Sequence, residues 1–394
     1  MRKYILLNIL LLTILFPVTV RGNHGREQTI NILYTGSLNG ELEPCGCSPK
    51  TDFGGVARLS GYLKGNKKAL SPYFLVDAGN FSGEDTPQGR LKTETLLKTF
   101  NIIGYDAVAF RKREAALQKD FLSSVSLKYK TRVVADSLHS VRSVIKRMDK
   151  LNIHFGTNPE NYEKGKINIL LSDIDVSDAK TIKGWDVIIL SSGEEIESPL
   201  KADGTIIVSG SLKGKKLGIL TLQFDNSGKI KNYKHRWQLL GNDIKEDQKI
   251  RQALKNYDTR VAGLLKETER PPKENVYLGV AKCAECHQPF INTWKKTGHA
   301  KAFSSLEKVG KSSDPECLVC HTVGFGEDGG FNSIATTPGL ANVQCEVCHG
   351  KGRDHLMDFY KPMEHVTESV CLRCHTKDKS PDFSYKDYLD KVIH

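Results

Sequence analysis

Beyond its first 22 residues the sequence lacks any apolar run long enough to cross a membrane, so no second span is expected. The run Tyr4–Leu15, behind Arg2 and Lys3, is itself short for a transmembrane helix. Residues 1–22 therefore resemble a secretory signal peptide cleaved near Gly22, with an uncleaved membrane anchor as the alternative. No cysteine follows this run closely enough to indicate a lipoprotein. We expect an exported protein, periplasmic or otherwise extracytoplasmic.

The last third of the chain lacks the positive charge of the rest. Residues 276–394 hold 14 Lys and Arg against 15 Asp and Glu, while the upstream residues hold 43 against 31. The upstream part thus carries a net charge of +12 and the whole chain +11. An exported protein rarely meets nucleic acid. We therefore expect the basic part to favour an acidic partner or surface, with redox proteins as partners and no nucleic acid.

Cysteine is almost absent before residue 280, and eight of the ten cysteines fall in four copies of Cys-x-x-Cys-His. In this motif two thiols form thioether bonds with the vinyl groups of one haem, and the adjacent imidazole ligates its iron. Cys-x-x-Cys pairs also suit tetrahedral zinc, but zinc does not require a histidine after the second cysteine in every copy. The repeat predicts four covalently bound haem c groups. The copies are Cys283, Cys286, His287; Cys317, Cys320, His321; Cys345, Cys348, His349; and Cys371, Cys374, His375.

The segment that holds these motifs has too little apolar side chain for an ordinary core. Its 119 residues, 276–394, would serve four haems. Most of its buried apolar surface must then come from porphyrin rather than from peptide. We expect short helices and long loops, and poor folding without haem.

Upstream, residues 28–240 alternate short apolar runs with helix-like patterns, which is typical of a layered α/β domain. Residues 246–269 have helical apolar spacing, and Pro271 and Pro272 end that helix. We therefore predict a signal peptide (1–22), an α/β domain (28–240), a helix and linker (241–275) and a tetrahaem domain (276–394). The predicted strands are Ile30–Tyr34, Tyr73–Asp77, Val133–Ala135, Ile167–Leu171, Val187–Leu190, Thr205–Val208 and Leu217–Phe224, and the predicted helices include Val56–Leu70 and Lys92–Phe100.

The downstream region resembles the multihaem cytochrome c family, in particular the tetrahaem electron carriers related to ammonia oxidation. The resemblance rests on segments beyond the attachment motifs and covers nearly all of residues 277–376. These segments are Trp294-x-x-x-x-His299-Ala-x-Ala-Phe303, Gly324-Phe325-Gly326, Gly330-Phe331, Thr337-Pro338, and Gln344-Cys345-Glu346-x-Cys348-His349-Gly350 with its following His355.

This resemblance implies distal iron ligands in addition to the four proximal histidines. By likeness to the family, His299 and His355 are distal ligands and His365 is the next candidate. His394, Met357 and Met363 remain as further candidates. Family members can keep one haem five-coordinate, so a fourth distal ligand is not required.

The upstream region resembles periplasmic calcineurin-like metallophosphoesterases of the 5′-nucleotidase group, over about residues 28–240. The resemblance implies a layered αββα sandwich. It rests on the segments Ile32–Gly40, Asp77–Asn80, Gly104–Ala109, Trp185–Leu190 and Gly210–Gly218.

Most of that family's metal ligands are missing, because weak neutral or basic residues stand where Asp, His and Asn are usual. We expect no dinuclear metal site, no catalytic residue and no phosphatase activity. Instead Lys112 and Arg113 are predicted to form a charged cluster with three carboxylates, leaving a scaffold. The positions concerned are Ser37, Asn39, Asn80, Lys112, Arg113, Glu114, Asp173, Gly193 and Glu195.

The two remaining cysteines, Cys45 and Cys47, follow the first predicted strand. In an oxidising compartment they suit a local disulfide or structural turn. Two alternatives remain open: a redox dithiol that exchanges electrons with haem, and a small metal site.

Two functions remain possible from sequence. The first is an electron carrier whose upstream domain is a docking scaffold. The second is a multihaem oxidoreductase that acts at an open-coordinate haem or at Cys45 and Cys47. The first is preferred, and the substrate of the second is unspecified.

Overall fold

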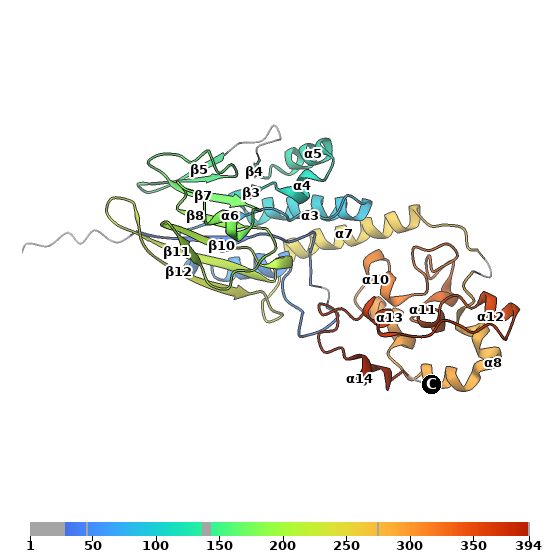
Figure 1. The fold of residues 1–394 in the computed structure, drawn as a ribbon. Coiled ribbons are helices and arrows are strands. Elements are labelled where there is room, and N and C mark those ends of the chain that lie inside the picture. The colour runs from blue at the N-terminus through green and yellow to red at the C-terminus, as the bar shows by residue number, and fades with distance from the viewer. Residues whose placement is uncertain (1–27, 45, 136–142, 274–275, 393–394) are drawn as a thin grey trace, which may run out of the picture.

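The computed structural model describes residues 28–44, 46–135, 143–273 and 276–392. The predicted signal peptide at 1–22, Cys45 and His394 lie outside the described residues. In the described ranges, no helix has the length and apolar character needed to cross a membrane. Figure 1 shows two parts: a layered α/β part upstream, and an irregular part of short helices and loops downstream.

Six strands form the first sheet, in the order β12-β11-β1-β2-β3-β4. The strand β1 lies parallel to β2 and antiparallel to β11, and the sheet continues in parallel from β2 through β3 to β4. The strands are β1 (Gln28–Thr35), β2 (Tyr73–Asp77), β3 (Ala107–Ala109), β4 (Val133–Val134), β11 (Lys216–Phe224) and β12 (Ile230–Leu239).

The second sheet has the order β5-β6-β7-β8-β10-β9 and packs face to face on the first. Because side chains alternate along a strand, Ile32 of β1 points into the layer between the sheets while Leu33 points to the outer face. Phe155 and Ile169 meet Ile32 in that inner layer. The strands are β5 (Ser143–Met148), β6 (Leu151–Gly156), β7 (Ile167–Ser172), β8 (Val187–Leu190), β9 (Leu200–Ala202) and β10 (Thr205–Ser209).

Helices cover both outer faces, so the layers run αββα. The first sheet is covered by α1 (Val56–Gly65), α2 (Lys67–Leu70), α3 (Pro87–Ile103), α5 (Lys119–Tyr129) and α7 (Gln248–Glu267), and the second by α6 (Val176–Ala179). The helix predicted over 246–269 is present as α7, which Asp247 caps. Its residues Ile250, Leu254 and Val261 pack into the same core cluster as Phe100 of α3. The helix therefore completes the outer layer of the upstream part.

The downstream part is mainly α and rich in loops, as predicted. Its core is one small cluster built around Phe303, Leu318 and Phe331. The helices are α8 (Gly279–Trp294), α9 (Ala302–Lys308), α10 (Pro315–His321), α11 (Cys345–His349), α12 (Arg353–Met357), α13 (Glu368–Leu372) and α14 (Tyr385–Leu389). Shorter helical turns lie at α4 (Lys112–Ala115), η1 (Leu212–Gly214), η2 (His299–Lys301) and η3 (Pro338–Leu340).

Ion pairs hold the two parts together. Asp378 accepts from both Lys213 (2.7 Å) and Lys215 (3.0 Å), and Lys50 pairs with Asp382 at 2.8 Å. Lys92 pairs with Glu316 at 2.6 Å. Four upstream lysines thus contact three downstream carboxylates, so part of the positive charge predicted to seek an acidic partner meets acidic groups of the same chain.

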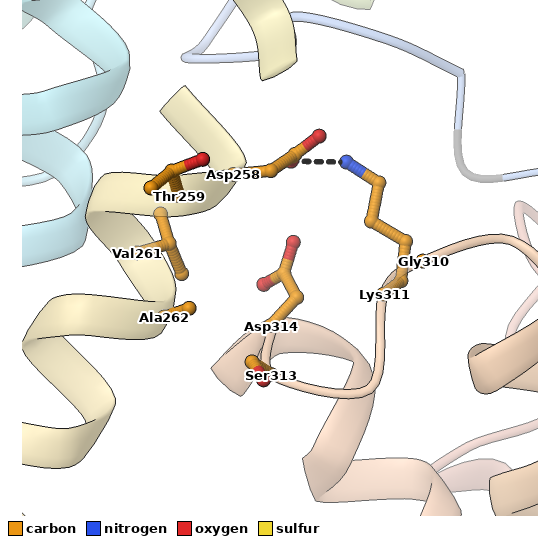
Figure 2. A pocket seen from close by; sticks show the side chains of 8 residues that line it. All are labelled: Asp258, Thr259, Val261, Ala262, Gly310, Lys311, Ser313 and Asp314. Carbon is orange, nitrogen blue, oxygen red and sulfur yellow. Dashed lines mark hydrogen bonds and ion pairs between the residues drawn. The ribbon is translucent and has the colours of Figure 1, made fainter. Parts of the chain in front are cut away.

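At one point of this contact the signs are exchanged, because a downstream lysine pairs with upstream carboxylates. Lys311 lies 2.6 Å from Asp258 of α7 and 3.0 Å from Glu43. Figure 2 shows Lys311 reaching across to Asp258 at the rim of a pocket of about 230 Å³ between α7 and the segment before α10. The pocket is lined by Asp258, Thr259, Val261, Ala262, Gly310, Lys311, Ser313 and Asp314.

Candidate haem-binding site

Short helices present the four Cys-x-x-Cys-His motifs. The first lies within α8, the second ends α10, the third forms α11, and the fourth spans the end of α13. Residues three apart lie on the same face of a helix, so in the first three motifs both thiols face one side. In the fourth motif, Cys374 lies in the turn after α13. All eight motif cysteines carry free thiols.

Tertiary packing brings motifs together that are distant in sequence. The thiols of Cys283 and Cys345 lie close enough to shift each other's pKa, and so do those of Cys320 and Cys374. The neighbouring Cys374 lowers the pKa of Cys320 to about 6, and Lys379 adds to this shift. The first motif is therefore next to the third, and the second next to the fourth. This spatial order differs from the order in sequence.

Two pairs of histidine rings face each other across the downstream part. The ring centres of His287 and His355 are 6.1 Å apart, and those of His299 and His375 are also 6.1 Å apart. Two metal–nitrogen bonds of about 2 Å each, together with the two ring radii, add up to about 6 Å. Each pair thus combines a predicted proximal histidine with a predicted distal one, at a separation that suits two ligands of one iron.

Backbone carbonyls orient three of the imidazoles. The Nδ1 atoms of His321, His355 and His349 lie 2.6, 2.8 and 3.3 Å from the carbonyl oxygens of Ala302, Lys361 and Glu364. A carbonyl can only accept, so Nδ1 carries the proton and the lone pair lies on Nε2. This is the usual way in which proteins prepare a histidine as a metal ligand.

Apolar and aromatic surroundings keep the other pair neutral. Burial lowers the pKa of His375, and burial and the charge of His375 lower that of His299. The ring of Phe383 stacks on His375 at 4.8 Å, and Tyr388 meets it edge-on at 5.5 Å. A neutral imidazole is the form that binds metal.

A buried carboxylate links the first and third motifs. Glu346 lies between Cys345 and Cys348 and accepts hydrogen bonds from the backbone N–H groups of Leu278, Gly279 and Gly352 at 2.9–3.1 Å. Leu278 and Gly279 begin α8, so Glu346 caps the helix that carries the first motif. The sequence analysis quoted this glutamate as part of a motif and missed its role, because its partners lie 67 and 68 residues upstream.

The remaining predicted ligands are less well placed. His365 is exposed on the segment between α12 and α13, and among the described residues no ring contact joins it to another histidine. Met357 is 82% exposed at the end of α12, and Met363 is half-buried. His394 lies outside the described residues.

Taken together, the donor set fits haem. Paired free thiols stand beside histidines whose Nδ1 atoms are tied to carbonyls, and two histidine pairs have the separation of two axial ligands. In the part of the chain that the structure describes, no group of three or more His, Cys, Asp or Glu side chains is arranged to hold a single metal ion.

In the upstream part, the positions that replace metal ligands lie at strand ends. Ser37 and Asn39 follow β1 and Asn80 follows β2, all with left-handed backbone (φ of 58°, 52° and 54°). The two loops are joined by backbone hydrogen bonds from Ser37 to Gly79 and from Asn39 to Asn80. Strained backbone of this kind is concentrated at functional sites.

The charged cluster predicted there differs in its partners. Arg111, and not Lys112 or Arg113, pairs with Asp173, at 3.0 Å. Although burial opposes it, Arg111 and the backbone N–H of Lys112 hold the pKa of Asp173 below its ordinary value. The predicted partners were wrong for the ion pair itself, which Arg111 makes because it precedes α4 and lies over Gly79. The charge of Lys112 adds to the lowering of the pKa of Asp173, while Arg113 donates to the carbonyl of Ser82.

The other two predicted carboxylates, Glu114 and Glu195, form no ion pair with Arg111. Glu114 is fully buried and accepts from the backbone N–H groups of Asn80, Ser82 and Arg111 at 2.8–2.9 Å. Glu195 pairs instead with Lys216, at 2.9 Å, nearer the surface. Glu114 thus fixes the loop after β2, and Glu195 does not join the cluster.

Of the two upstream cysteines, Cys47 is disulfide-bonded, as the first of the three alternatives predicts. It lies exposed on the segment between β1 and α1. Cys45 is outside the described residues.

Comparison with known proteins agrees with this division. Residues 282–350 match the profile of the family described as cytochrome c554 and c-prime. Cytochrome c-554 of Nitrosomonas europaea is 37% identical over 100 residues, which cover 22% of this chain and 43% of that protein. The chain thus spans less than half the length of this relative. The predicted resemblance to multihaem cytochromes is confirmed. The downstream part, residues 276–392, is called the cytochrome c554-like region below, after the match within it.

The upstream part resembles solved structures of another kind. A 5′-nucleotidase precursor from Thermus thermophilus superposes with a TM-score of 0.52 at 15% identity, over 63% of this chain and 62% of that one. A calcineurin-like phosphoesterase from Bacillus subtilis matches over 59% of this chain and 98% of its own, at 15% identity and a TM-score of 0.49. The first likeness confirms the predicted αββα metallophosphoesterase-like fold, and at this identity it shows the fold alone.

Proposed function

We propose that the protein is an exported tetrahaem c-type cytochrome that transfers electrons to or from redox proteins. In this proposal residues 1–22 are a signal peptide, 28–240 an inactive phosphoesterase-like scaffold, 241–275 a helix and linker, and 276–394 the tetrahaem domain. The observation that carries it is the gathering of four Cys-x-x-Cys-His motifs, two of whose histidines each face a second imidazole at 6.1 Å.

The residues proposed to hold haem are those of the four Cys-x-x-Cys-His motifs. Cys283 with Cys286, Cys317 with Cys320, Cys345 with Cys348, and Cys371 with Cys374 would form the thioether bonds. When bound, haem c supplies an iron that gains and loses one electron at a time. The chain contributes the ligands and their orientation, and Glu346 holds the first and third motifs in register.

Axial ligation is proposed pair by pair. His287 and His355 would ligate one iron, and His375 and His299 a second. His321 and His349 are the proximal ligands of the other two, and His365 is the next distal candidate. Ligation by two histidines gives lower reduction potentials than ligation that includes methionine.

The scaffold role rests on chemistry and on contact. Ser37, Asn39 and Asn80 are weak neutral ligands, and the Arg111 guanidinium lies beside Asp173. The cytochrome c554-like region docks on this part through Asp378 and Asp382. The scaffold would therefore dock its own cytochrome region. Hydrolysis of nucleotides or simple phosphate esters is not expected with any divalent metal; metal-dependent hydrolysis that is lost in Asp173→Ala would contradict this role.

Intact mass and haem staining after denaturation test the function. We expect a mass that exceeds the polypeptide by four haems, and the mass of the bare polypeptide would refute the proposal. Ligation is tested separately by the ferric spectrum of His355→Ala and His299→Ala, each of which should convert one haem to high spin. Met357→Ala is the matched control for His355 because it lies on the same short helix and is 82% exposed. An unchanged spectrum in both histidine variants would contradict the pairing.

The alternative function, an oxidoreductase acting at an open-coordinate haem or at Cys45 and Cys47, is favoured by one observation only. The segment that carries Cys47 is tied to the cytochrome c554-like region by ion pairs at Glu43 and Lys50.

A further inference from the structure

In the segment between β1 and α1, the described residues 41–44 and 46–53 are here called the cysteine loop. Figure 1 shows this blue segment leaving the layered part and reaching the red end of the chain. Two contacts fix it there: Glu43 pairs with Lys311 at 3.0 Å, and Lys50 pairs with Asp382 at 2.8 Å. Cys47, three residues before Lys50, is disulfide-bonded and exposed. The loop thus carries its disulfide to the boundary with the cytochrome c554-like region.

Residues on both sides of Cys47 share a pocket with the downstream chain. This pocket holds about 30 Å³ and has Asp378 in its wall, three residues after the proximal histidine His375. A space of this size suits one water molecule, which can serve as a proton carrier beside the loop. The pocket is lined by Glu41, Glu43, Pro44, Thr51, Phe53, Lys213, Lys215 and Asp378.

The downstream segment that contacts the loop begins at two haem-attachment motifs. Lys379, next to Asp378, lies 3.7 Å from the sulfur of Cys320 of the second motif. Cys374 of the fourth motif lies close enough to the same sulfur to lower its pKa. Residues 374–382 therefore connect the second and fourth motifs directly to the cysteine loop.

Charged groups of both signs surround the loop. Lys50 belongs to the loop and pairs with Asp382, and the shared pocket is lined by Lys213 and Lys215 together with Glu41, Glu43 and Asp378. Although burial opposes it, the hydrogen bond from Lys213 to Asp378 raises the pKa of Lys213, so this lysine stays charged. These ion pairs hold the loop against the segment that follows the fourth motif.

We propose that the Cys47 disulfide is a redox site that takes electrons from the cytochrome c554-like region. The S–S bond breaks, two thiols form, and two protons come from solvent. The two electrons come from two haem irons, each oxidised from ferrous to ferric. This inference rests on the proposed function, because the region must bind haem to deliver electrons.

The test uses the haem-loaded full chain without oxygen. The haems are reduced with a one-electron dye, thiols are alkylated with iodoacetamide, and intact mass is measured. Wild type should gain two carbamidomethyl groups and consume two electrons more than Cys45→Ser/Cys47→Ser, which should gain none. Absorbance reports haem reduction independently, so failure of the proposed function is seen as missing haem reduction. Fully reduced haems with no alkylation would overturn the redox site and leave the proposed function intact.

A charge swap separates internal electron delivery from direct reduction by the dye. Lys50→Asp or Asp382→Lys alone should slow the gain of labels several-fold, because each breaks one of the two contacts that fix the loop. The double variant Lys50→Asp/Asp382→Lys restores the pair and should recover the wild-type rate, with haem reduction unchanged throughout. Equal labelling rates in all three variants and wild type would show that the dye reduces the disulfide directly, which would contradict the proposal.

Discussion

The two parts of this chain are stabilised in different ways. In the upstream part, two large clusters of aliphatic and aromatic side chains fill the space between the sheets and under the outer helices. Among the described downstream residues, the buried cluster has only seven members, from Phe303 to Ala341. Eight large apolar side chains there are exposed, against five in the upstream part, which is about twice as long: Phe290, Val309, Val319, Ile334, Met357, Phe359, Tyr360 and Leu372. The upstream part can bury its own apolar surface. We expect the downstream part to need a bound group to do so.

This contrast predicts its largest effect when haem is withheld. If the full chain is made without haem attachment, residues 276–392 should lose their fold, because metal and cofactor binding here supplies folding free energy. The upstream part should stay folded. Limited proteolysis followed by mass mapping should show cleavage confined to the downstream part. A protease-resistant haem-free downstream part would contradict the comparison.

A substitution that creates a cavity in the upstream core tests whether this part is stabilised by its own buried side chains. Phe155 is fully buried between the sheets, where its ring meets Phe74 at 6.0 Å. Phe155→Ala should lower the free energy of unfolding of the upstream part by about 3–5 kcal/mol, because it leaves a cavity. Leu127→Ala, on the exposed face of α5, is the matched control and should change stability by less than about 0.5 kcal/mol. Chemical denaturation followed by Trp fluorescence measures both, and the haem absorbance of the folded protein should stay unchanged.

Polar groups also carry part of the downstream fold. Glu346→Gln keeps the shape of the side chain but replaces an acceptor oxygen by an amide that cannot accept. At least one N–H group among Leu278, Gly279 and Gly352 then loses its partner, at a cost of about 1–3 kcal/mol. Thermal unfolding monitored at the haem band should show a lower midpoint. Glu285→Gln, an exposed residue of α8, is the control, and an equal shift in both variants would remove the special role of Glu346.

The smallest effect is expected at the contact between the two parts. Hydrogen bonds from Lys213 and Lys215 lower the pKa of Asp378, so the stabilisation it provides is present above the ordinary aspartate pKa of 3.8 and is lost as the pH falls below it. Added salt should weaken the same contact by screening. Hydrogen exchange of the segment 213–216 should therefore speed up at acid pH and at high salt. Asp378→Asn should remove most of the acid dependence, and a contact insensitive to both conditions would argue that apolar packing holds it.

The sequence predicted much of this architecture because the relevant signals are local. All seven predicted strands are present, since each is a short apolar run that ends up buried. The sequence analysis missed five strands, β3, β5, β6, β9 and β12. β12 alternates exposed and half-buried residues at the edge of the first sheet, and its lysines hide the apolar pattern of a buried strand.

Some features of the site are likewise predictable from local sequence, and others are not. By itself the sequence determined the four attachment motifs, because two thiols and an imidazole within five residues are chemistry that the local chain already holds together. Only the tertiary structure decided which histidine faces which: His287 and His355 are 68 residues apart, and no local rule links them. It likewise decided that Arg111 rather than its neighbours meets Asp173, and that the loop of Cys47 meets Asp382. Those partners are set by how strands, helices and loops pack. Local patterns in a single sequence cannot predict such contacts, because the residues that meet are far apart along the chain.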